Sequence, residues 1–184
     1  MSRPAPGRLE LVRDFLNTVS VARDTDELAD LDGYDAWLTR AGLSVGAAPV
    51  TETDRRRAVV LRDGLRALVG AHDAVGPLDP QTLRSVRAAV QAPALRLGVD
   101  EYGAIGLAPA RDRHGQAALA AVLGVVAEAT FAGTWPRLKL CRRPTCRWAF
   151  YDASPARAAV WCTMSVCGAQ HKARAYRQRR SAAD

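Results

Sequence analysis

One stretch decides the fold of the C-terminal part of the chain: CRRPTCRWAFYDASPARAAVWCTMSVCG, residues 141–168. It holds all four cysteines of the 184-residue protein, Cys141, Cys146, Cys162 and Cys167. Four residues separate the members of each pair, and fifteen residues separate the two pairs. Two closely spaced pairs joined by a segment of hairpin length are typical of a tetrahedral metal site. The stretch therefore predicts one Zn²⁺ held by four thiolates.

The predicted role of this zinc is structural. Four thiolates complete the coordination sphere and leave no open position for water or substrate. The alternatives are four unrelated cysteines, two disulfides, or a redox site. The sequence contains no Cys-x-x-Cys motif and no visible secretory signal. Both observations favour a cytoplasmic protein with reduced thiols over the alternatives.

The residues between the cysteine pairs predict a hairpin. Residues 147–151 are expected to run outward and residues 158–161 to return, with turn-forming residues between them. Residues 170–180 are expected to form a basic helix. We expect the aromatic side chains of this module to form its small core rather than to stack on bases: Trp148, Phe150, Tyr151 and Trp161.

A module of this size buries too little apolar surface to fold without help. A structural Zn²⁺ contributes on the order of 10 kcal/mol or more to such modules. We therefore expect loss of the metal, or the substitution Cys162→Ser, to unfold residues 137–180.

The first 136 residues predict a helix-rich domain. Apolar residues recur at helical spacing from Leu9 onward, and Tyr34 and Trp37 are expected in the core. Asp32 and Asp79 are the expected N-caps of two helices. Glycines at 42 and 133 are expected to end two helices. The expected helices cover residues 9–19, 32–41, 51–72, 80–90 and 112–131.

A different pattern interrupts these helices. Leu95, Leu97 and Val99 alternate with other residues, and Ile105 and Leu107 do so after a polar segment at 100–103. This alternation predicts a β-hairpin with a four-residue turn. The predicted fold class is α+β and mostly α: a helical domain with one β-hairpin at 1–134, then a four-cysteine zinc finger of hairpin plus basic helix at 135–184.

The charge is concentrated in the predicted finger. Residues 137–180 carry eleven Lys and Arg side chains and one acid, Asp152, so their local net charge is +10 within a total of +7. Such a surface favours a polyanionic partner. The alternative is that these cations only neutralise the zinc thiolates or the helix dipole. The candidate nucleic-acid contacts are Arg142, Arg143, Arg147, Lys172, Arg174, Arg177, Arg179 and Arg180.

The sequence predicts no catalytic site. It has no P-loop, no strand-associated G-x-G-x-x-G and no H-E-x-x-H. His72, His114 and His171 are isolated along the chain. The segment Asn17-Thr18 is expected to face solvent or cap a helix, with a ligand pocket as the alternative. No apolar run approaches the ~18 residues of a membrane span, so a membrane partner is not expected.

A longer pattern runs through the C-terminal module: CRRPTCRWAFYD at 141–152, WCTM at 161–164, CG at 167–168, and a basic helix from Lys172. In this pattern the chain resembles the CGNR zinc-finger family of bacterial proteins. The segment DFLNT at 14–18, the stretch from Trp37 to Leu43 and the predicted hairpin resemble the ABATE domain that usually precedes this finger.

The resemblance implies a transcriptional regulator whose finger binds DNA. The concentrated positive charge would also suit RNA. The N-terminal domain would then sense a small molecule or a protein. The signature Cys-Gly-Asn-Arg reads Cys167-Gly168-Ala169-Gln170 here, so one amide-bearing and one cationic side chain are replaced. The alternative function is a protein–protein interaction module with a purely structural zinc site.

Overall fold

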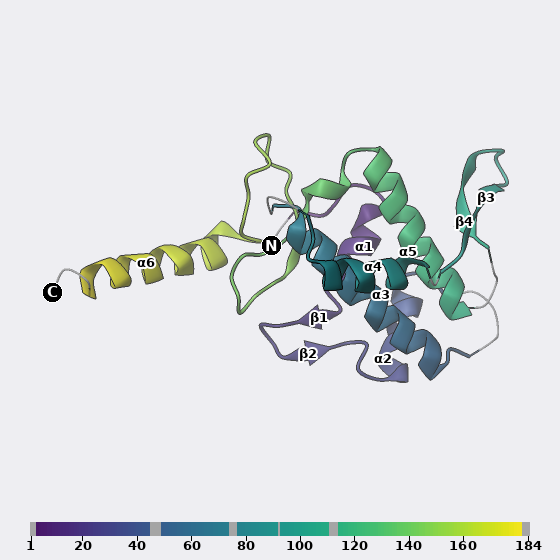
Figure 1. Ribbon diagram of the computed structural model, residues 1–184, viewed down its shortest axis with the longest axis horizontal. Helices are drawn as coiled ribbons and strands as arrows, with labels where there is room; N and C mark the ends of the chain where they lie inside the picture. Colours follow the sequence, from purple (N-terminus) through teal and green to yellow (C-terminus); the bar gives the residue numbers. More distant parts are fainter. Residues whose placement is uncertain (1–2, 45–48, 74–76, 92, 111–113, 182–184) are drawn as a thin grey trace.

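The computed structural model describes residues 3–44, 49–73, 77–91, 93–110 and 114–181. The protein is mostly helical with small antiparallel hairpins, and its four cysteines lie together near the C-terminus (Figure 1). None of the described helices combines the length and the apolarity that a membrane span requires.

Six α-helices and three hairpins make up the described fold. The helices are α1 Leu9–Leu16, α2 Leu31–Arg40, α3 Glu52–Ala71, α4 Pro80–Gln91, α5 His114–Phe131 and α6 Ala169–Ser181. The paired strands are β1 Val19–Ser20 with β2 Thr25–Asp26, β3 Leu95–Val99 with β4 Ile105–Pro109, and β5 Leu138–Leu140 with β6 Ala149–Tyr151. A 3₁₀ turn, Trp135–Arg137, precedes β5, and a π-helical turn, Met164–Gly168, precedes α6.

Local capping explains where the helices begin and end. Thr51 and Asp54 form a capping box at the start of α3, and the Asp79 carboxylate accepts the first amides of α4. The predicted cap at Asp32 is wrong. Asp30 has the extended backbone of a cap, and its Oδ1 accepts the amide of Gly33 at 2.8 Å. Gly42 follows α2 with φ +66°, as expected of a helix stop.

The hairpin predicted at 95–107 is confirmed. Val99 pairs with Ile105, so its turn has five residues, 100–104, rather than four. The sequence does not predict the second, shorter hairpin, β1–β2, because two-residue strands leave no alternation to detect. The buried guanidinium of Arg62 on α3 holds β2, donating to Asp26 Oδ2 at 2.9 Å.

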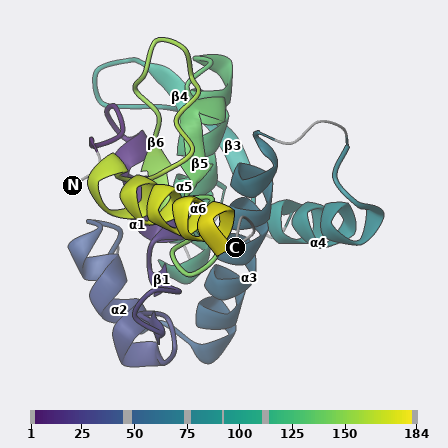
Figure 2. The ribbon, with the colours of Figure 1, turned by 90° about the vertical axis from the view of Figure 1, so that its left-hand side faces the viewer.

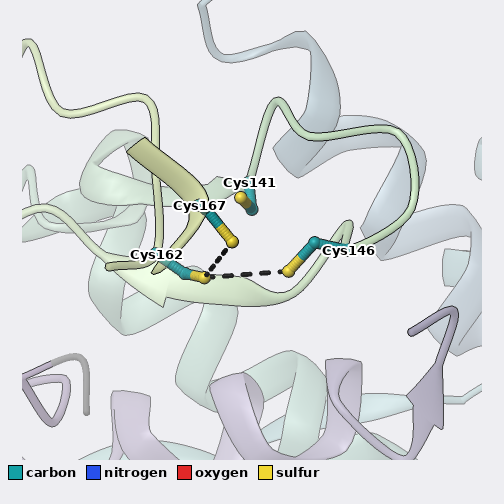
Figure 3. Close-up of side chains that lie close together, drawn as sticks. All are labelled: Cys141, Cys146, Cys162 and Cys167. Atoms are coloured by element: carbon teal, nitrogen blue, oxygen red, sulfur yellow. Dashed lines mark hydrogen bonds between the residues drawn. The ribbon is translucent and has the colours of Figure 1, made fainter. Parts of the chain in front are cut away.

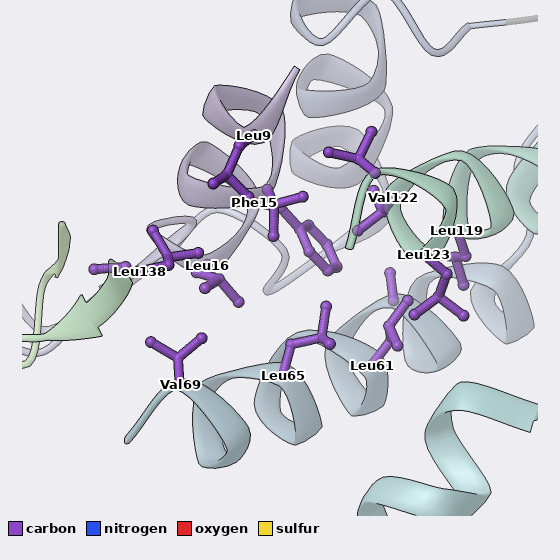
Figure 4. Close-up of a cluster of buried hydrophobic side chains, with 14 of the residues drawn as sticks. Leu9, Phe15, Leu16, Leu61, Leu65, Val69, Leu119, Val122, Leu123 and Leu138 are labelled. Carbon is purple, nitrogen blue, oxygen red and sulfur yellow. The ribbon is translucent and has the colours of Figure 1, made fainter. Parts of the chain in front are cut away.

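The core lies between α1, α3 and α5 (Figure 4). Tyr34 and Trp37 of α2 are buried as expected, and the ring of Trp37 lies 4.9 Å from that of Phe15. Leu138, Leu140 and Ala149, from the hairpin that carries the first two cysteines, belong to the same core. The sequence pattern does not reveal the burial of this hairpin against the helices. The division at residue 134 stays a prediction.

The strand pairing of the C-terminal module differs from the expected one. β6 pairs with β5, which precedes the first cysteine, and not with residues 158–161. β5 is buried along its whole length, so packing against the helices favours this pairing. Residues 158–161 instead form a loop, in which Val160 accepts the amide of Arg142 at 2.9 Å.

Asn17 joins the helical part to this hairpin. Its side-chain amide donates to the Ala149 carbonyl at 2.9 Å and accepts the Ala149 amide at 2.8 Å, and these bonds are buried. The side chain therefore mimics a neighbouring strand for β6. It is buried rather than facing solvent, although Asn17 does occupy the C-cap position of α1.

We predict that Asn17→Ala destabilises the protein by about 3 kcal/mol, because it leaves the buried amide and carbonyl of Ala149 without partners. Urea denaturation at a fixed excess of zinc measures this change. The matched control is Thr39→Ala, which removes an exposed hydrogen bond to Ser44 and should change stability by less than about 0.5 kcal/mol. Equal midpoints for the two variants would contradict the bridging role of Asn17.

Candidate metal centre

The β5–β6 hairpin and the turn before α6 position the four cysteines. Cys141 directly follows β5, and its amide donates to the Trp148 carbonyl at 2.9 Å. Cys146 lies in the connecting turn, where Arg147 has φ +51°. Cys162 precedes the π-helical turn that contains Cys167. The two pairs therefore approach each other from separate turns.

The four sulfur atoms form one compact cluster (Figure 3). They all lie within 4.8 Å of one another, and the Sγ of Cys162 lies 3.7 Å from those of Cys146 and Cys167. A tetrahedral site with Zn–S bonds of about 2.3 Å has sulfur–sulfur edges of about 3.8 Å. A disulfide requires about 2.05 Å. The cluster is consistent with one zinc site and excludes disulfides between these pairs.

Electrostatics also favour a bound cation. Burial, followed by the charges of Cys141 and Cys146, raises the pKa of the Cys162 thiol. Burial is likewise the largest influence that raises the pKa of Cys146. Thiolates gathered this closely repel one another, and a divalent ion relieves that repulsion. The donor set therefore fits Zn²⁺, which four thiolates hold with no open position.

A buried ionic cluster holds the loop between the cysteine pairs. Lys139 of β5 is buried, and its Nζ lies 2.9 Å from Asp73 and 3.1 Å from Asp152. It also donates to the Arg157 carbonyl at 2.6 Å. Burial opposes ionisation of Asp152, but hydrogen bonds from Ser154 and Lys139 keep the pKa of this carboxyl below its usual value. These contacts connect the loop to the C-terminal end of α3.

The arginines of the first metal turn have partners within the protein. Arg142 is exposed and lies 3.9 Å from Asp73, and the Arg143 Nε donates to the Thr145 hydroxyl at 2.8 Å. Arg143 also helps to lower the pKa of the Cys167 thiol. Arg147 is half-buried, with its guanidinium against Gly70 of α3. These contacts give the turn arginines a role within the fold. Their predicted contacts with nucleic acid stay predictions.

The remaining candidate contacts lie on α6. This helix packs against the π-helical turn and extends away from the body of the protein (Figures 1 and 2). Lys172 and Arg180 are exposed. The side chains of Arg174, Arg177 and Arg179 lie outside the described residues, although the helix backbone is described throughout.

A hollow of about 920 Å³ separates the first metal turn from the start of α6. Arg142, Arg143 and Gln170 line it together with Trp161, whose ring lies 4.8 Å from that of His171. Of the four aromatic residues expected in the core of the module, Phe150 is buried, and Trp148, Tyr151 and Trp161 are half-buried. His171 is therefore not isolated in the fold. His72 is not isolated either, since its Nδ1 lies 2.8 Å from the Leu138 carbonyl.

Sequence reasoning missed the residues that hold the metal module in place. Arg66 of α3 donates to the Leu16 carbonyl at 2.6 Å and to the Arg147 carbonyl at 2.9 Å. Together with Asn17, His72 and Lys139 it anchors the hairpin to the helices. The partners of Arg66 lie 50 and 81 residues away along the chain, so no local pattern marks it.

Two family models match the chain. One is the ABATE domain, described as "Putative stress-induced transcription regulator", which matches residues 9–134. The other is the CGNR zinc finger, which matches residues 137–180. A comparison with curated proteins finds no match to the chain. The first model covers more than half of the 184 residues.

We predict one zinc per chain by elemental analysis of the purified protein. The substitution Cys162→Ser should weaken zinc binding by more than about tenfold, since changes outside the ligand shell alone have effects of that size. Competition with a chromophoric chelator measures the affinity. Ser165→Ala, an exposed change in the same turn, is the matched control and should bind zinc normally. Equal affinity of the two variants would rule out Cys162 as a ligand.

We predict that zinc removal disorders only part of the module. Chelation should expose the amides of residues 161–168 to hydrogen exchange, whereas the amides of Lys139 and Phe150 stay protected, because they face each other in the β5–β6 ladder and the helical core holds both strands. This replaces the expectation that residues 137–180 unfold as one unit. Exchange in β5 and β6 as fast as in residues 161–168 would restore that expectation.

Proposed function

The chain belongs to the ABATE family, described as "Putative stress-induced transcription regulator", and from that premise we propose that it binds DNA through α6 and the metal module. In this proposal Cys141, Cys146, Cys162 and Cys167 hold one structural Zn²⁺. The family description is that of a regulator and not of an enzyme. We place the protein in the cytoplasm, where its thiols stay reduced.

The placement of α6 is the observation that carries the proposal. The helix has thirteen residues and a length of about 20 Å, and it extends away from the helical core (Figure 1). Residues 153–183 contain no acidic side chain. An exposed, cationic helix of this size fits the major groove of DNA, which is about 12 Å wide. Phosphate contacts from its Lys and Arg side chains would supply most of the affinity.

Zinc has an indirect role in this proposal. Cys167 lies in the turn that runs directly into α6, and Cys162 lies just before that turn. Ligation of both residues to the same ion as Cys141 and Cys146 would fix the start of α6 relative to β5 and β6. The metal thereby orients the helix and takes no part in a reaction.

The departure from the Cys-Gly-Asn-Arg signature also affects the expected DNA contacts, because Ala169 and Gln170 replace its Asn and Arg. Ala169 and Gln170 are exposed at the start of α6, and Gln170 lines the hollow beside Arg142 and Arg143. A cation at position 170 would face the same hollow. We propose that Arg142, Lys172 and the later arginines of α6 make the contacts that remain, with Arg143 and Arg147 mainly supporting the metal turn.

A second candidate function is protein binding by the same module. Met164 and Val166 of the π-helical turn are 59% and 51% exposed, next to the base of α6. Exposed apolar side chains of this kind favour a protein contact. In that case the zinc would be purely structural and the charge of α6 would not determine affinity.

We predict that binding to a random-sequence DNA duplex weakens steeply with salt. Each phosphate contact adds about 0.9 to the slope of log affinity against log salt concentration. Replacing Arg174 and Arg177 with Ala should therefore reduce the slope by about 2. Fluorescence anisotropy of a labelled duplex, titrated at several salt concentrations, gives the slope. Competition with single-stranded RNA and DNA tests the preference for duplex DNA.

The matched control replaces Arg84 and Arg87 with Ala. These two residues are exposed on α4, with the same sequence spacing and charge as Arg174 and Arg177. The control should leave the salt slope unchanged. Absence of binding at low salt, by a protein that contains its zinc, would contradict the proposal and favour the protein-binding alternative.

A further inference from the structure

The N-terminal domain contains a hollow between α3, α4 and α5, remote in sequence from the metal centre. Its volume is about 340 Å³, within the range of about 300–1,000 Å³ that is typical of small-molecule pockets. Its walls are mostly apolar with a cationic edge. The lining residues that matter here are Thr53, Arg57, Val60, Ala88, Pro93 and Leu119.

Small side chains create this hollow. A Cβ on Gly64 of α3 would lie 3.4 Å from the Cβ of Ala89, so α3 and α4 pack in direct contact there. One turn earlier on α3, Val60 lines the hollow, and α4 contributes only the short side chains of Ala88 and Ala89 to its lining. Val60 remains 54% exposed as a result. An apolar ligand that covers Val60 would gain the free energy of burying this surface.

The two arginines at the edge differ in their contacts. The Arg56 Nε donates to Glu52 at 2.8 Å, so its charge is already paired. Arg57 is exposed and makes no hydrogen bond or ion pair within the described part of the chain. A guanidinium can bind a carboxylate through two parallel hydrogen bonds. Arg57 is thus a free anion-binding group beside an apolar hollow.

We propose that this hollow binds a small amphipathic carboxylic acid. The acid's apolar part lies against Val60, Ala88 and Leu119, and its carboxylate pairs with Arg57 at the edge. The hydroxyl of Thr53, one turn before Arg57 on α3, lines the same hollow and can donate to the carboxylate. The inference rests on the sensing role that the sequence analysis expects of the N-terminal domain, and it names the ligand class and the site.

The position of the hollow on α3 gives the ligand a route to the metal module. Val60 and Arg57 lie in the N-terminal half of α3. The C-terminal part of the same helix holds the module through Arg66, which donates to Arg147, and the adjoining His72, which contacts Leu138. A ligand that joins α4 to α3 therefore stabilises the helix on which the metal hairpin rests.

The test is a calorimetric titration of the full-length, zinc-loaded protein without DNA. The probes are octanoate and its neutral counterpart octanamide. Octanoate should bind at least about tenfold more tightly than octanamide, because only octanoate pairs with Arg57. Arg57→Gln should remove this tenfold preference and leave octanamide binding unchanged. Arg87→Gln, an exposed change on α4 outside the hollow, is the charge-matched control and should change neither.

A second variant tests the location. Val60→Trp should fill the hollow and abolish binding of both probes, and Ala88→Phe fills it from the opposite wall if Val60→Trp does not fold. Absence of octanoate binding to the folded protein would overturn the proposal. So would equal binding of octanoate and octanamide, or unchanged binding to a folded variant with the hollow filled. Since no DNA is present, failure here is distinct from failure of the DNA-binding proposal.

Discussion

The two hydrogen bonds between the Asn17 side chain and Ala149, 2.9 and 2.8 Å long, are the interaction on which the arrangement of the C-terminal module depends. They place β6 against the end of α1, and β5 pairs with β6 from the other side. Because Cys141 follows β5 and Cys146 precedes β6, these bonds also determine where the first two metal ligands lie. The metal then orders only what remains, which is the second cysteine pair and the start of α6.

The cations of the module divide into two groups with different roles. Lys139 and Arg147 are turned toward α3, and Arg137 donates to the carbonyls of Asp152 and Ser154. These side chains hold the module together, so the local net charge of +10 overstates what a nucleic acid can contact. Among the described side chains of α6, Lys172 and Arg180 are exposed and make no such contact. We therefore expect the interface mainly on the projecting helix, with Arg142 as the contact from the first metal turn.

The parts of the structure that were predictable from sequence carry local signals. Capping residues such as Thr51 and Asp79, glycine stops and apolar periodicity act within a few residues, and metal ligation restricts both the type and the spacing of the cysteines. The partner of β6 has no such signal. Residues 138–140 and 158–161 are both short and largely apolar, and only packing against α3 favours the former. Asn17 contacts a residue 132 positions away, which no periodicity reveals.

Helix α3 connects the two proposed sites. One of its faces lines the hollow at Arg57 and Val60, and its C-terminal part holds the metal hairpin through Arg66 and, just beyond the helix end, His72. A ligand can shift the equilibrium of the metal module only by as much as its affinity differs between the arrangements of that module. The contacts along α3 would transmit this difference in ligand affinity from the hollow to the metal module. If the Arg66 contact with Arg147 were weakened, ligand binding in the hollow would no longer change the stability of the metal module. The cysteines and the hollow themselves would stay unchanged.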